Sequence, residues 1–373
     1  MKLIFSLLLI ATIAYANNTA QLMQQALNSL VQLLPLSSSE MKFTDPQFEK
    51  EIKKHLVDLE SNFLAAKHSK ELHRNTLEPS YETILEQIEE AKISFNSDNK
   101  YMARMKINQI GYLCLSCHTQ FPKDKLKTQI TNHKLIDKVF KTDAFNRGNI
   151  QFILRDYQDA LKSYEKVIAK RIILNNIKSK SDDSLLPQKQ LFDKRLYQSI
   201  FNSVLIYTKI QNAPNKAQEF INKLDSQYRL PKYLISEINK WNKQLNFWQK
   251  EVNLKKKIKS MHQESVLDGS HDIDLMMVSG ELARNYYSSP RKTKEGEVLF
   301  WLAMAEFRFG KNMFFSLGDI YLKQCIHHYQ KTKMAKKCYD AYEEEIIFRN
   351  TGSSGVFLPE ATKKELDTLK ALL

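Results

Sequence analysis

Turn-forming residues are scarce in this chain, and their scarcity limits what it can fold into. The 373 residues include only 9 glycines and 9 prolines, where average usage would give about 26 and 19. Sandwiches and barrels need many tight turns, so this composition favours long helices with short connections. The hydrophobic fraction of 43% is enough for a buried core. We therefore expect an all-α fold.

The first residues have the pattern of a secretory signal peptide. Lys2 is followed by an apolar run over residues 3–14, and Ala14-Tyr15-Ala16 has the small-x-small form that signal peptidase accepts. We predict cleavage after Ala16, which makes the mature chain a periplasmic protein. An uncleaved N-terminal anchor is the alternative, although the apolar run is short for a membrane-spanning helix.

The chain is basic, with 56 Lys and Arg against 42 Asp and Glu and a formal charge of +14. Such an excess attracts acidic surfaces over long distances. An exported chain without a recognisable nucleic-acid motif is a poor candidate for binding nucleic acid, and none is expected. The partners we expect are an unidentified redox or docking protein and an anionic membrane surface.

Four amphipathic helices are predicted in residues 17–126. Apolar residues repeat at helical spacing over about 19–34, after Thr44-Asp45-Pro46, from Pro79, and from Tyr101 past Cys117. A proline directly after Asp45 is typical of a first helical turn, and the Asn96-Ser97-Asp98-Asn99 run ends the third helix. Four helices of similar length with short loops favour an up-down-up-down bundle.

Residues 127–373 are also expected to be helical, and two places in them match a helix-turn-helix repeat. The first consists of Gly148, Tyr157, Ala160 and Tyr164, and the second, weaker match of Leu317-Gly318, Tyr321, Ala335 and Tyr339. In such repeats, small residues occur where two helices approach and aromatic residues fill the neighbouring space. These positions resemble the tetratricopeptide repeat, which implies an α-hairpin array that docks a protein.

The segment Cys114-Leu115-Ser116-Cys117-His118 has the C-x-x-C-H pattern of c-type haem attachment. Two cysteines three positions apart on a helix can form thioethers with both vinyl groups of a porphyrin, and the adjacent imidazole can approach the iron. A thioredoxin-like dithiol would need a βαβ setting, and a zinc site would need further ligands. With chance as a third alternative, we predict one covalent haem c on Cys114 and Cys117, with His118 as proximal iron ligand.

Residues 110–121, which contain this motif, resemble the terminal haem helix of the cytochrome c′ family. The resemblance covers about residues 19–122, and only the haem helix is specific. It implies a four-helix bundle whose interior holds the porphyrin. The predicted organisation is a signal peptide (1–16), a haem bundle (17–126) and a tetratricopeptide-like domain (127–373).

The second iron ligand stays open at this point. Relatives in the cytochrome c′ family often leave this position vacant or offer a methionine from the first helix. In an up-down-up-down bundle, Met23, His68 and His73 lie at the same end as His118. Core packing is the alternative role for Met23, and solvent exposure is the alternative for the two histidines. A sixth ligand favours electron transfer, and an open site favours gas binding.

Cys325 and Cys338 lie on either side of a predicted connection at residues 330–333. A helical hairpin could bring their Cβ atoms within bridging distance, and export makes oxidation plausible. A disulfide that stabilises the last hairpin is therefore predicted, with two buried free thiols as the alternative.

Together these features predict a non-enzymatic, periplasmic monohaem cytochrome that transfers electrons and docks a partner through its helical repeats. One alternative is a haem-based sensor or binder of nitric oxide or carbon monoxide. The other is a helical scaffold protein in which the haem is only structural.

Overall fold

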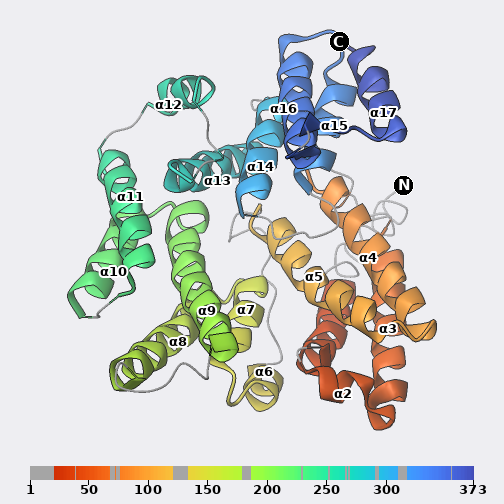
Figure 1. Cartoon of the computed structure of the whole chain (residues 1–373), viewed down its shortest axis with the longest axis vertical. Coiled ribbons are helices and arrows are strands. Elements are labelled where there is room, and N and C mark those ends of the chain that lie inside the picture. Colours follow the sequence, from red (N-terminus) through yellow and green to blue (C-terminus); the bar gives the residue numbers. More distant parts are fainter. Residues whose placement is uncertain are drawn as a thin grey trace, which may run out of the picture. The chain divides into compact units, whose positions relative to one another are not determined.

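In the computed structural model, the described part of the chain is almost entirely helical (Figure 1). The structure describes residues 21–373 except 38, 68–71, 73–75, 121–132, 179–185, 228–229, 251–252, 265–266, 268, 290–293, 310–316 and 354, and without the side chains of 115–116, 133–135, 171–178 and 186–193. The predicted all-α class is confirmed. The predicted signal peptide, residues 1–16, lies outside the described residues. Within those residues, no helix combines the length and the apolarity needed to cross a bilayer.

The chain divides into two compact units, one ending at Ile206 and one running from Tyr207 to Leu373. The first contains a helix over residues 21–37, α2 (Glu40–Thr44), a 3-10 turn (Pro46–Phe48), α3 (Glu49–Ala66), α4 (Glu78–Asn96), α5 (Lys100–His118), α6 (His133–Val139), α7 (Ala144–Ile153), α8 (Tyr157–Lys178) and α9 (Leu186–Leu205). A π-helical turn, Ile206–Ile210, spans the division.

The second unit is also built from helices, with one small strand pair. Its elements are α10 (Pro214–Gln227), α11 (Lys232–Trp248), α12 (Leu254–Met261), α13 (Asp272–Ser288), α14 (Glu295–Phe309), α15 (Leu317–His328), α16 (Lys333–Arg349), β1 (Thr351–Gly352), β2 (Gly355–Val356) and α17 (Glu360–Lys370). The two short strands pair antiparallel.

Local capping sets the helix boundaries before α3 and α5. The Asp45 side chain accepts a hydrogen bond from the backbone of Gln47, with Pro46 in the first turn, as the sequence predicts. After α4, Asp98 adopts a positive φ of 64°, and Asn99 then caps α5 by accepting from the Met102 backbone at 3.2 Å. The short helix α2 is not among the predicted helices; Ser39 caps it.

Side-chain hydrogen bonds connect the helices before residue 119 to one another. The Tyr81 hydroxyl of α4 donates to the Phe63 carbonyl of α3 at 2.8 Å, and the two rings stack. Ser37, in the helix over residues 21–37, donates to Asn108 of α5 at 2.8 Å. These contacts bring Phe63 at the end of α3 beside the start of α4, and fix the first helix against α5.

Helices that follow the predicted haem segment share the core of the first unit. Val31 packs with Ile136 and Phe140 of the α6 region and with Ile150 of α7, and Cys114 packs against the same cluster. The compact unit is therefore larger than the segment 17–126 predicted to hold the haem. The predicted division between 126 and 127 itself lies outside the described residues.

The glycines of the two repeat matches both lie at helix contacts, but in different ways. A Cβ on Gly148 would meet the Tyr164 ring at 2.8 Å, so α7 and α8 approach closely only because this residue is glycine. Ala160 and Tyr164 are fully buried. In the second match, Gly318 lies against Phe307 of α14, so its glycine serves the α14–α15 contact and not a contact within the predicted α15–α16 hairpin.

Buried ion pairs and indole hydrogen bonds organise the start of α13 in the second unit. Asp272 is fully buried; it pairs with Arg308 at 2.7 Å and accepts from the Trp241 indole at 3.2 Å. Asp274 pairs with Lys257 at 2.8 Å. Each buried carboxylate is thus compensated by a charged partner, and the contacts tie α11, α12, α13 and α14 together.

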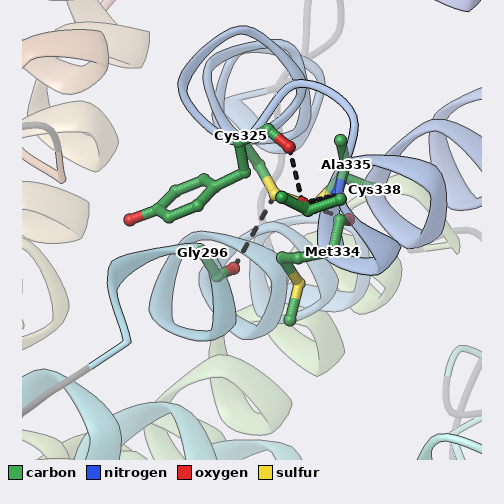
Figure 2. Close-up of a disulfide and its surroundings, with 7 residues drawn as sticks. Gly296, Cys325, Met334, Ala335 and Cys338 are labelled. Carbon is green, nitrogen blue, oxygen red and sulfur yellow. Dashed lines mark hydrogen bonds between the residues drawn. A yellow bond between two sulfur atoms is a disulfide. The ribbon is translucent and has the colours of Figure 1, made fainter. Parts of the chain in front are cut away.

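Cys325 of α15 and Cys338 of α16 form a disulfide, shown in Figure 2. Both residues are fully buried, and their Cα atoms are 6.2 Å apart. The Sγ atom of Cys325 lies 3.8 Å from the carbonyl oxygen of Gly296 in α14. The bridge therefore closes the α15–α16 pair at a point that also packs against α14.

Loss of this disulfide should destabilise the second unit. The bridge closes a loop with a sequence separation of 13, for which chain-entropy arguments give about 3 kcal/mol. Cys325→Ala with Cys338→Ala should lower the free energy of unfolding by about that amount. All three tryptophans, Trp241, Trp248 and Trp301, belong to this unit, so tryptophan fluorescence in urea reports its unfolding.

Wild-type protein in reductant is the matched control, because it loses the bridge without losing side-chain volume. Equal urea midpoints for oxidised and reduced wild-type protein would contradict the prediction.

Candidate functional site

The C-x-x-C-H residues occupy the last turns of α5. Cys114 and Cys117 are free thiols, the second of them buried, and His118 is the final residue of the helix. Positions three and four apart lie on one face of a helix. One side of α5 therefore presents two thiols and an imidazole together.

The imidazole of His118 is held by the backbone of α7. Its Nδ1 atom contacts the carbonyl oxygen of Ile153, the last residue of that helix. A carbonyl only accepts hydrogen bonds, so Nδ1 carries the proton and Nε2 keeps its lone pair. The last carbonyls of a helix have no partner within the helix, which explains why this one is available to a side chain.

Arg155, in the connection between α7 and α8, also contacts the motif. Its Nη2 atom donates to the His118 carbonyl at 3.1 Å, and its side chain is buried. The residue has a φ of 62°, in the left-handed region that favours glycine and costs other residues about 1 kcal/mol or more. The fold maintains this strained turn directly beside the motif.

Burial shifts all three ionisable groups of the motif toward their neutral forms. It raises the pKa of the Cys114 thiol to about 12 and that of Cys117 to about 11. Burial, assisted by the positive charge of Arg155, lowers the pKa of His118 to about 4. Redox-active dithiols need lowered thiol pKa values, and the motif is surrounded by helices. Both observations disfavour the thioredoxin-like alternative.

A small apolar cavity of about 60 Å³ lies beside the motif. Cys114 and His118 line it from α5, Phe63 lines it from α3, and Met23 lines it from the first helix. The sequence-predicted ligand candidate Met23 is therefore next to the same cavity as His118.

The remaining predicted site residues are either outside the described residues or in the second unit. His68 and His73 lie outside the described residues, and Cys325 and Cys338 belong to the second unit. The groups that sequence reasoning missed are the Ile153 carbonyl and Arg155. A backbone carbonyl leaves no trace in a sequence, and an arginine in a helix connection reads as an ordinary exposed charge.

No protein-family model matches the chain, and comparisons with curated proteins and with solved structures found no match. Over the residues that the structure describes, no group of three or more His, Cys, Asp or Glu side chains is arranged to hold a metal ion.

The lowered pKa of His118 predicts a specific acid sensitivity of the haem-free chain. An ordinary histidine in the unfolded chain has a pKa of about 6.5, against about 4 in the folded protein. As the pH falls through this window, only the unfolded state takes up the proton, so the free energy of unfolding falls. Urea unfolding followed by circular dichroism at pH 7, 6 and 5 should show this decline.

His118→Asn should make that decline shallower, because the variant has no imidazole to protonate. His327→Asn, which removes an exposed imidazole, is the control and should behave as wild type. An undiminished pH dependence in His118→Asn would sink the prediction.

Proposed function

We propose that this chain is a periplasmic, monohaem c-type cytochrome that transfers electrons and is not itself an enzyme. Cys114 and Cys117 attach one haem c, and His118 is the proximal iron ligand. The observation that carries the proposal is the contact of His118 Nδ1 with the Ile153 carbonyl beside two free thiols on the same helix. Metal-binding histidines characteristically donate their second ring nitrogen to such an acceptor.

The donor groups fit a covalently attached haem. The Nε2 lone pair of a neutral imidazole is a haem iron ligand, and both thiols are available for thioether bonds. The bound haem would supply one-electron redox chemistry. The cavity of about 60 Å³ is far below the roughly 300–1,000 Å³ of typical ligand pockets. The residues that line it would therefore have to rearrange to admit a macrocycle.

The proposal also assigns a role to each of the two predicted domains. Residues 17–126 form the four-helix haem bundle; the packing of the helix over residues 21–37 with α3 and α5 around the cavity supports this. Residues 127–373 form an α-hairpin array that docks a redox partner. The buried repeat positions Gly148 and Tyr164 support a hairpin at α7–α8, and the basic charge favours an acidic partner or an anionic membrane surface.

Covalent haem is the first testable consequence. The protein should be expressed in a periplasm that has a cytochrome c maturation system, and haem should stay on the chain through denaturing electrophoresis. Cys114→Ala with Cys117→Ala should abolish that haem stain, because neither thioether can form.

Cys325→Ala with Cys338→Ala is the matched control. It removes the same number of sulfur atoms but leaves the motif intact, so its haem stain should persist. Colourless wild-type protein whose Cys114 and Cys117 remain alkylatable would refute the proposal.

Met23 is the proposed sixth ligand, because it lines the same cavity as His118. The loaded wild-type protein should then be low-spin and slow to bind carbon monoxide. Met23→Leu keeps the side-chain volume but removes the sulfur, so the ferrous protein should become high-spin and bind carbon monoxide readily. Absorption spectra with and without carbon monoxide measure both effects.

Met41→Leu, at a residue that is 81% exposed, is the control and should leave the spectra unchanged. If Met23→Leu also leaves them unchanged, Met23 is not the ligand. A wild-type protein that is already high-spin would favour the nitric oxide or carbon monoxide binder over electron transfer.

A further inference from the structure

Helix α12 (Leu254–Met261) carries a concentrated run of positive charge in the second unit. Four of the five residues 255–259 are lysines, and the wider segment 250–261 contains five lysines against one acidic residue, Glu251. In Figure 1, the α12 ribbon is separated from the ribbons of α11 and α13. Side chains therefore decide which face of α12 meets the rest of the unit.

One face of α12 is used to attach the helix to its neighbours. Lys257 pairs with Asp274 of α13 at 2.8 Å, and its Nζ atom lies 4.8 Å from the centre of the Phe247 ring of α11. Met261, one turn further on, is only 1% exposed. Because residues four apart share a helix face, Lys257 and Met261 define the side of α12 that faces the unit.

The opposite face of α12 presents three lysines to solvent. Lys255, Lys256 and Lys259 are all exposed, and no described side chain forms a salt bridge with any of their ammonium groups. With 3.6 residues per turn, the three fall within roughly 100° of the helix circumference, on the side away from Lys257. Their charges therefore act together and are not compensated within the described part of the unit.

The chemistry of this face fits a charged lipid surface better than a folded partner. Protein interfaces are depleted of lysine and enriched in arginine and aromatic residues. A lysine ammonium is a compact point charge without the directional fork of arginine, and clusters of such charges bind the head groups of anionic lipids. Leu254 and Ile258 are only partly exposed, so charge dominates what this helix offers.

We propose that the face of α12 formed by Lys255, Lys256 and Lys259 docks the protein on a bilayer of anionic phospholipid. The assignment deepens the proposed function, on which it rests for the membrane that an exported chain meets, and it requires no haem. Attachment is reversible and weakens with salt, because charge supplies it.

Cosedimentation of the full mature chain with vesicles tests the docking. Wild-type protein should bind vesicles of equal parts phosphatidylglycerol and phosphatidylcholine, and should not bind vesicles of phosphatidylcholine alone. The variant Lys255→Gln, Lys256→Gln and Lys259→Gln should bind the charged vesicles at least tenfold more weakly, since each lysine near an anionic surface contributes roughly a fivefold factor.

The matched control removes three positive charges from exposed lysines elsewhere. Lys50, Lys141 and Lys364 are exposed, and their joint replacement by glutamine gives a chain with the same net charge as the α12 variant. It should weaken binding by less than about threefold, because it leaves the α12 face intact. Circular dichroism should show that both variants are folded.

Four results would overturn the proposal. Wild-type protein may fail to bind the charged vesicles, or bind neutral vesicles equally well. Both triple variants may weaken binding equally, which would assign it to the overall charge of the chain. Binding of soluble poly-L-glutamate without binding of vesicles would assign the face to an acidic protein. Haem staining of the same preparations reports separately on the cytochrome proposal, so the two failures are distinguishable.

Discussion

The contact between His118 and the Ile153 carbonyl is the interaction on which the candidate site depends. It joins the end of α5 to the end of α7, and it satisfies both partners: a carbonyl without an intrahelical donor and a half-buried imidazole. It also fixes the tautomer, because only Nδ1–H can donate to a carbonyl. The chemistry offered at Nε2 is therefore decided by a helix that lies outside the motif.

The connection between α7 and α8 makes that contact geometrically possible. The chain turns back at Arg155 with a positive φ, and Gly148 lets α8 approach α7 to the distance of the Tyr164 ring. The Tyr164 hydroxyl in turn donates to Asn149 and accepts from Asn202 of α9. Ile153 itself lines the small cavity beside the motif, so a movement of this end of α7 affects the candidate site directly.

Sequence reasoning succeeds here where the signal is local. The proline after Asp45 and the polar run at residues 96–99 place the boundaries of α3, α4 and α5 within a few positions, because capping and turn preferences act over a few residues. The C-x-x-C-H motif is equally local, and it predicts Cys114, Cys117 and His118 as the haem residues. Contacts with Ile153 and Arg155 cross about 35 positions and depend on packing, which leaves no periodic or compositional pattern to read.

Arg155 shows what this non-local contact contributes to the chemistry. Burial first, and then the positive charge of Arg155, disfavour a protonated imidazole and lower the pKa of His118 to about 4. The same guanidinium opposes any further positive charge near His118. A metal bound through Nε2 would be favoured in its less positive oxidation state, since second-shell charge and burial tune the potential. The potential of the proposed cytochrome is then a property of the α7–α8 turn as much as of the C-x-x-C-H motif.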